Sequence, residues 1–233
     1  MHNLADGFVY YVVFLFSTTV HEAAHAWAGK LGGDLTAYHG GQVTLDPRPH
    51  IRREPFGMVV LPVLSTLLSG WPFGFASAPY DREWALRYPR RAGWMAVAGP
   101  AANLFLVVLA AIVIRTGMVI GVFAPPDSAG FDSIVASSWG GVWQGAAFVI
   151  SVVFSLNLML ACLNMIPVPP LDGSAAVVLA LSEETARKYQ QLLRSSQAFG
   201  MMGLLIAWRL FDLLYDPIFT TALNLLYPGA SYG

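Results

Sequence analysis

Long apolar stretches without charged side chains dominate this chain and limit what it can fold into. Hydrophobic residues make up 56% of the sequence, and charged residues make up only 12%. A soluble domain carries roughly 25% charged residues, and the mean hydropathy of +0.56 points in the same direction. The composition therefore predicts an integral membrane protein.

Four or five segments are apolar and long enough to span or enter a bilayer, which takes about 20 helical residues. The second contains four prolines, so a re-entrant hairpin, or a short span with irregular chain, suits it better than a straight helix. In the last, four residues interrupt the apolar run, which leaves one span or two short helices as alternatives; they are Arg209, Asp212, Asp216 and Pro217. The segments cover residues 8–28, 55–80, 93–114, 140–166 and 198–227.

The fold class that follows is an all-α polytopic membrane protein. We expect about four to six transmembrane or re-entrant segments, in a single domain over residues 1–233. Between the first two segments, residues 35–45 contain Gly40-Gly41 with Tyr38, Val43 and Thr44 beside them. A glycine pair between such residues is typical of a tight turn, so we expect a small β-hairpin or extended region there.

Basic residues gather in three of the connecting stretches, and the stretch over residues 123–139 has none. The positive-inside rule then places residues 123–139 outside and the other three stretches in the cytoplasm, with both ends of segment 55–80 on the cytoplasmic side. This topology suits a prokaryotic cytoplasmic membrane. The net charge of −1 offers no basic surface for nucleic acid, and no sequence feature indicates an oligomeric state. The basic residues are Lys30, Arg48, Arg52, Arg53, Arg82, Arg87, Arg90, Arg91, Arg187, Lys188 and Arg194.

The first apolar segment contains the pattern H-E-x-x-H. His21, Glu22 and His25 are its only acidic or basic residues. Positions i and i+4 lie on one face of a helix, so both imidazoles can reach one metal ion, and Glu22 can act as the general base on a water molecule. Ionisable groups at membrane depth are costly and usually functional. The alternative is a structural cluster in which Glu22 pairs with a histidine.

A catalytic zinc usually has three protein ligands and keeps one position for water. Asp172 is the best third donor, because the prolines of Pro167-Val168-Pro169-Pro170 end the preceding helix, and irregular backbone at membrane depth lines a cavity or is buried in protein. Gly173 would allow a sharp turn that aims the carboxylate inward. A second interpretation, which does not exclude the first, is that Asp172 caps a helix over residues 174–181.

With these residues in place, the chain resembles the site-2 protease family of intramembrane zinc metalloproteases. Three elements carry the resemblance, and they occur in the family's order. The first is the H-E-x-x-H pattern within a span, the second is similar to the family's Gly-Pro-x-x-Asn, and the third is similar to Asn-x-x-Pro-x-Pro-x-Leu-Asp-Gly. In this chain they are His21–His25, Gly99–Asn103 and Asn164–Gly173.

The resemblance implies a role for each matched residue. His21, His25 and Asp172 would hold one zinc ion per chain, and Glu22 would be the general base and later the proton donor to the leaving amine. Asn164 would contact the substrate backbone or the developing oxyanion. Asn103 would support the site or the substrate, and we expect the same role for Asn157, which the resemblance does not cover. An asparagine inside a span can equally join neighbouring helices, and this is the alternative for Asn103, Asn157 and Asn164.

The resemblance also implies a function, namely hydrolysis of peptide bonds in or near the transmembrane helices of membrane-protein substrates. Residues 75–79 would offer an extended edge to an unwound substrate. The chain has no insertion the size of a PDZ domain or a CBS pair, so it resembles a minimal member. A divalent-metal transporter is one alternative, disfavoured because the external halves of segments 93–114 and 140–166 offer only Arg115 and neutral polar groups. A scaffold that binds membrane proteins without cutting them is another.

Overall fold

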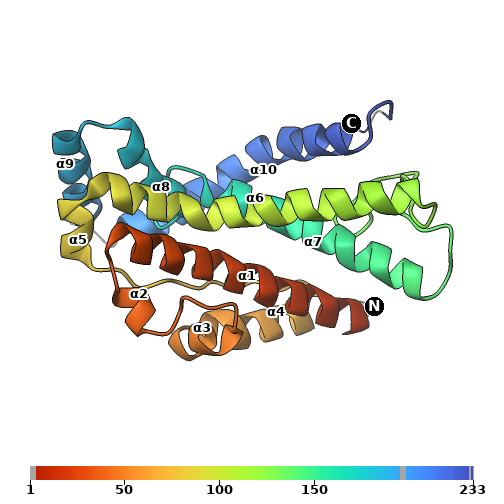
Figure 1. The fold of residues 1–233 in the computed structure, drawn as a ribbon, viewed down its shortest axis with the longest axis horizontal. Coiled ribbons are helices and arrows are strands. Elements are labelled where there is room, and N and C mark those ends of the chain that lie inside the picture. The colour runs from red at the N-terminus through yellow and green to blue at the C-terminus, as the bar shows by residue number, and fades with distance from the viewer. Residues whose placement is uncertain (1–3, 195–197, 231, 233) are drawn as a thin grey trace.

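Three long helices form the frame of the computed structural model, which describes residues 4–194, 198–230 and 232. They are α1 (Leu4–Gly32), α6 (Pro89–Val119) and α7 (Val142–Asn164), and by length and composition each can cross a membrane. Figure 1 shows them running side by side. Within the described residues the fold is all-helical, as predicted, with three candidate spans. The predicted count of four to six membrane segments is not confirmed.

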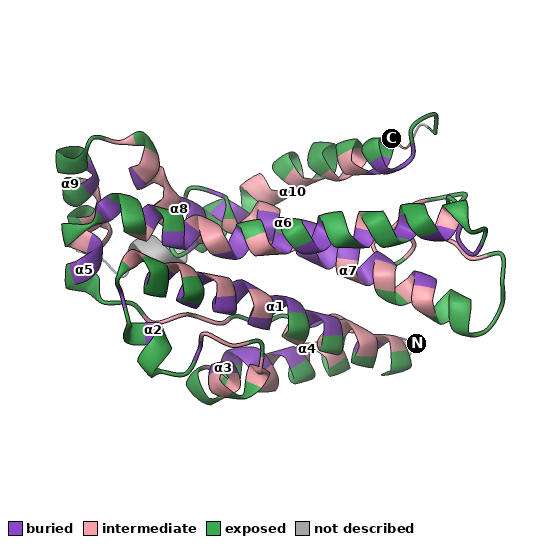
Figure 2. Ribbon diagram, viewed as in Figure 1, coloured by how far each residue is buried: buried purple, intermediate pink, exposed green. Residues whose placement is uncertain are grey.

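Each long helix is buried along one strip and exposed along the rest, as Figure 2 shows. On α6 the buried strip includes Gly99, Asn103 and Ala110, whereas Trp94 and Phe105 on the other side are exposed. The exposed side is as apolar as the buried side, which is the arrangement of a helix that faces lipid rather than water. The frame is therefore that of a membrane protein whose polar residues lie inside.

Shorter helices connect the long ones, and most of them gather at one end of the frame, opposite the loop over residues 120–141 (Figure 1). A final helix, α10 (Ala198–Leu226), runs unbroken past Pro217, so the second of the two alternatives for this segment, two short helices, is wrong. The remaining helices are α2 (Thr36–His39), α3 (Pro47–Arg53), a π-helix (Phe56–Val60), α4 (Leu61–Ser69), α5 (Arg82–Arg87), α8 (Asp172–Ala176), a 3-10 helix (Val177–Ala180) and α9 (Glu183–Arg194).

The broken segment over residues 55–80 folds as a helix followed by an extended return. The π-helix continues into α4, which ends at Gly70, where φ is +77°. The chain then turns back, and the N–H of Phe75 donates to the carbonyl of Gly57 at 3.0 Å. Near the exit, Arg53 Nε donates to the Ser77 carbonyl at 3.0 Å. The segment therefore leaves beside the point where it begins.

The expected β-hairpin over residues 35–45 is not formed, and the described residues contain only isolated β-bridges elsewhere. The Asp34 carboxylate accepts hydrogen bonds from the Thr36 N–H at 2.9 Å and the Thr36 hydroxyl at 2.6 Å, which starts the short helix α2. Gly41, with φ of +73°, then ends that helix, and the N–H of Gln42 donates to the Ala37 carbonyl. The glycine pair therefore terminates a helix instead of joining two strands.

Candidate metal centre

Helix α1 carries both histidines and the glutamate on its buried side. His21, Glu22 and His25 are each 5–6% exposed. The two imidazoles are one helical turn apart, with ring centroids 4.6 Å apart in an edge-to-face arrangement. Their Nε2 atoms lie only 2.9 Å from each other. The spacing of the H-E-x-x-H pattern therefore brings two nitrogen donors to one point, as predicted.

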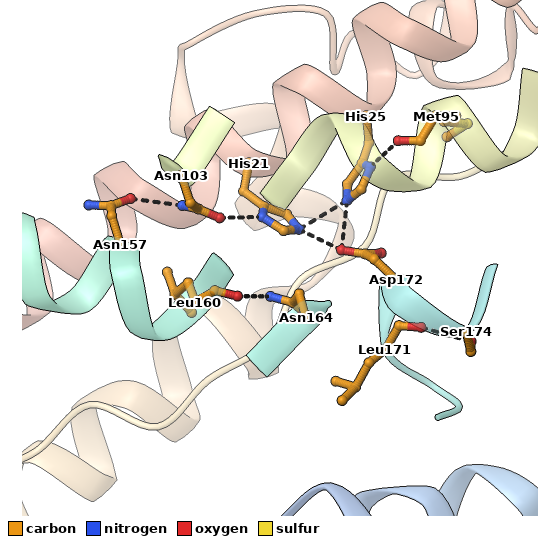
Figure 3. A network of polar contacts seen from close by, with 10 residues as sticks. All are labelled: His21, His25, Met95, Asn103, Asn157, Leu160, Asn164, Leu171, Asp172 and Ser174. Carbon is orange, nitrogen blue, oxygen red and sulfur yellow. Dashed lines mark hydrogen bonds and ion pairs between the residues drawn. The ribbon is translucent and has the colours of Figure 1, made fainter. Parts of the chain in front are cut away.

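The third predicted ligand reaches the same point from the loop after α7. The Oδ2 atom of Asp172 lies 3.1 Å from Nε2 of His21 and 3.2 Å from Nε2 of His25, as Figure 3 shows. A carboxyl group has an ordinary pKa of about 3.9, and it binds a metal ion in its deprotonated form. Asp172 is therefore an anionic donor.

The loop that presents Asp172 differs in two details from the prediction. Asp172 is the first residue of α8 and its carboxylate faces the histidines, so its predicted role as a helix cap is wrong. Gly173 does not have a positive φ. Glycine is needed at this position because the backbone of Met165 packs closely against it, and a side chain there would collide with the Met165 carbonyl. On the far side, the Tyr189 hydroxyl donates to the Ser174 carbonyl at 3.0 Å and ties α8 to α9, and burial raises the pKa of this tyrosine.

Hydrogen bonds on the outer side of each imidazole orient both rings. Nδ1 of His25 donates to the Met95 carbonyl at 2.7 Å. A backbone carbonyl can only accept, so the proton of His25 is on Nδ1 and the Nε2 lone pair points inward. Nδ1 of His21 lies 2.6 Å from Oδ1 of Asn103. Asn103 therefore lies on the outer side of a predicted ligand.

The inward-facing donors suit a metal ion. Ligand atoms about 2.0–2.1 Å from a tetrahedral zinc are about 3.3 Å apart, and the three donor atoms here are separated by 2.9, 3.1 and 3.2 Å. A cation between them would offset the repulsion of a carboxylate oxygen and nearby lone pairs. Gly99 keeps that space open, because a β-carbon there would collide with Nε2 of both histidines. Two nitrogens and one oxygen form a donor set that zinc accepts.

Glu22 and Asn164 are the predicted catalytic residues. Glu22 lies beside the predicted metal ligands, whereas Asn164 is hydrogen-bonded within its own helix. Glu22 is buried beside the two histidines in α1, and its Oε2 atom has no hydrogen-bond partner among the described residues. Asn164 is half-buried at the end of α7, and its amide donates to the Leu160 carbonyl at 3.0 Å, not to the three ligands.

Two contributors were missed by the sequence reasoning. The Met95 carbonyl orients His25, and nothing in the sequence marks a backbone atom for this purpose. Gly99 was identified only as part of a motif, although its lack of a side chain is what admits an ion. Its neighbour Pro100 does not mark Met95 either, because a proline inside a helix frees the carbonyl four residues earlier, which here is that of Ala96.

Comparison with known proteins finds similarity over most of the chain. The profile of Peptidase family M50 matches residues 9–208. YwhC of Bacillus subtilis, whose name proposes a zinc metalloprotease, is 32% identical over 72% of this chain and 71% of its own length. Rip2 of Mycobacterium tuberculosis, named in the same terms, is 32% identical over 83% of this chain and 63% of its own length, so the chain covers less than two thirds of Rip2. No solved structure matches the chain significantly.

Proposed function

Because this chain belongs to peptidase family M50, the site-2 proteases, we propose that it is a zinc-dependent endopeptidase that cuts other membrane proteins in or near their transmembrane helices. Membership already makes it a membrane protein of a metalloprotease family. The proposal adds the zinc, the intramembrane substrate and the class of process, which is regulated intramembrane proteolysis. It rests on the residues of the candidate metal centre.

The convergence of His21, His25 and Asp172 carries the proposal. These three side chains come from segments about 150 residues apart, yet their donor atoms lie within 4.8 Å of one another. Bringing a carboxylate and two imidazoles together at the buried side of apolar helices is costly unless a cation is held between them. When bound, zinc polarises the carbonyl of the substrate and lowers the pKa of the attacking water to about 7.

Proton transfer would be the task of Glu22. Its Oε2 atom is buried and has no partner among the described residues, so it is free to accept a hydrogen bond from a water molecule. The same carboxylate would take the proton from that water and later pass it to the leaving amine. Asn164 would have to exchange its bond to the Leu160 carbonyl for one to the substrate.

The extended return over residues 75–79 would present the substrate to the site. A transmembrane helix must unwind before cleavage, because its carbonyls are hydrogen-bonded and shielded by its side chains. An unwound segment needs new partners for its backbone groups, and an extended edge supplies them. The Ser77 carbonyl, which accepts from Gln42 and Arg53, holds this return in place.

The location we propose is a prokaryotic cytoplasmic membrane, with the metal centre toward the cytoplasm. The relatives named above are bacterial. The C-terminal half of α1 and the helix α8, which carry the ligands, lie with α5 and α9, opposite the loop over residues 120–141 (Figure 1). Basic residues such as Lys30, Arg90 and Arg91 belong to that end, which the positive-inside rule assigns to the cytoplasm.

The first experiment measures zinc content and cleavage of a transmembrane reporter for wild type and Glu22→Gln. We expect about one zinc per chain in both proteins and cleavage only by wild type, because the variant keeps the ligands and loses the base. Val12→Ala, on the exposed side of α1, is the control and should behave as wild type. Wild type without zinc would contradict the metal centre. Zinc in both proteins with cleavage in neither would favour a binding scaffold.

A further inference from the structure

A buried chain of hydrogen bonds leads from the candidate metal centre across three helices (Figure 3). From His21 on α1 it passes to Asn103 on α6 and then to Asn157 on α7. Both asparagines are 0% exposed. Asn103 Nδ2 donates to Asn157 Oδ1 at 2.8 Å, and Asn157 Nδ2 donates to the Val153 carbonyl at 2.8 Å.

The hydrogen bond between Asn157 and the Val153 carbonyl determines the donor and the acceptor of every other bond in this series. The Val153 carbonyl can only accept, so the atom of Asn157 that faces it must be the amide nitrogen. The oxygen of Asn157 then faces Asn103 and must accept, which requires the nitrogen of Asn103 on that side. The oxygen of Asn103 is therefore the atom that faces His21.

The last bond determines which nitrogen of His21 carries a proton. The amide oxygen of Asn103 lies 2.6 Å from Nδ1 of His21, and it can only accept. Nδ1 must then hold the proton, and Nε2 has its lone pair available toward His25 and Asp172. Asn157 is therefore joined to His21 through Asn103.

We propose that Asn157 is a positioning residue for the metal centre, which acts through Asn103 to hold His21 in the tautomer that binds zinc. This inference rests on the proposed zinc function. Without Asn157, the amide of Asn103 can rotate and present its nitrogen to Nδ1 of His21. Nδ1 then accepts, the proton moves to Nε2, and an N–H group points at the place of the ion. Changes in residues that orient metal ligands typically lower metal affinity 10–100-fold.

The test compares zinc affinity, measured by chelator competition, in wild type, Asn157→Leu and the double variant Asn103→Asp/Asn157→Leu. Asn157→Leu should bind zinc about 10–100 times more weakly than wild type. The double variant should recover most of the loss, because a carboxylate at position 103 only accepts and again holds the proton on Nδ1. Ser155→Ala is the control, since Ser155 is equally buried on α7 and outside this chain of bonds, and it should bind as wild type does.

Two outcomes would overturn the inference. Wild-type affinity in Asn157→Leu would mean that Asn157 does not control His21. An equal loss in the single and double variants would mean that Asn157 only joins the helices, because a structural contact is not restored by a second change.

A second measurement needs no variant of Asn157 and no zinc. In chelator-treated wild type labelled with ¹⁵N-histidine, the His21 signals, assigned by their loss in His21→Gln, should show the proton on Nδ1. An unprotonated Nδ1 would contradict the inference even if Asn157→Leu failed to fold. The failure of wild type to bind zinc would instead contradict the proposed function, so the two failures are distinguishable.

Discussion

Gly99 lacks a side chain at the point where α6 passes closest to the two imidazoles. A β-carbon there would collide with Nε2 of His21 and of His25, and these are the atoms that must face the ion. We expect Gly99→Ala to lower zinc affinity by more than about 100-fold, the upper end of what changes outside the ligands cost, because the methyl group takes the space of the ion itself. Chelator competition measures this directly.

Gly145→Ala is the matched control for that prediction. Gly145 also lies within a long helix, α7, but a β-carbon there would meet no atom within 4 Å. The control should bind zinc as wild type does and fold as well. If Gly99→Ala also bound zinc normally, the ion would have to lie on the other side of the histidines, away from α6.

How far the sequence predicts this site depends on whether residues share a helix. His21 and His25 could be paired from their spacing alone, because a helix fixes the geometry of positions i and i+4. Asp172 could be joined to them only through the family resemblance and the prolines before it. The contact between Asn103 and His21, 82 positions apart in the chain, depends on how two helices pack, and hydropathy does not encode that.

At the scale of elements, the return after α4 is held by close backbone contact. Gly57 and Phe75 are joined by a backbone hydrogen bond, and a β-carbon at Gly57 would collide with the Phe75 carbonyl. We expect Gly57→Ala to displace the return, so that amide hydrogen exchange over residues 73–80 speeds up by about tenfold or more, which corresponds to about 1.4 kcal/mol of lost local stability. Zinc affinity should not change, because no metal ligand lies in this segment.

The control for this element is Leu68→Ala, which shortens an exposed side chain on α4 and leaves exchange in the return unchanged. If Gly57→Ala left exchange unchanged too, the return would be held by other contacts. One contact of this kind is Trp71 at the tip, whose ring lies 5.2 Å from that of Tyr10 and 4.4 Å from that of Phe131. Cleavage of a transmembrane reporter by Gly57→Ala tests the role of the return separately. Slower cleavage than by wild type is expected if the return presents the substrate.

The same scale shows where sequence patterns are ambiguous. Apolar runs identified α1, α6 and α7 within a few residues, because a long uncharged stretch has few alternatives to a helix. The pair Gly40-Gly41 did not reveal its structure, since glycine ends helices as readily as it forms hairpin turns. The deciding contact is the Asp34 carboxylate on Thr36, a local bond that hydrophobic patterning does not detect.

At the scale of the whole molecule, the candidate metal centre joins two helices, α1 and α8, that are far apart in the sequence. Its ligands come from α1 and α8, and α6 packs against both. Without an ion, the contacts of Asp172 Oδ2 with Nε2 of His21 and of His25, at 3.1 and 3.2 Å, are hydrogen bonds that need a proton on Nε2. An ion bound only by the folded state stabilises it by mass action, by about 4 kcal/mol when free zinc is 1,000 times Kd.

Removal of zinc should therefore lower the thermal midpoint of wild type in detergent by several degrees, and added zinc should restore it. Asp172→Asn is the comparison that isolates the cause, because it keeps the shape of the site but loses the anionic ligand. Its midpoint should respond little to chelator or to zinc. Equal responses in both proteins would place the stabilising ion elsewhere. A response in wild type alone would show that this one centre holds α8 against α1 and so supports the position of the end of α7, where Asn164 lies.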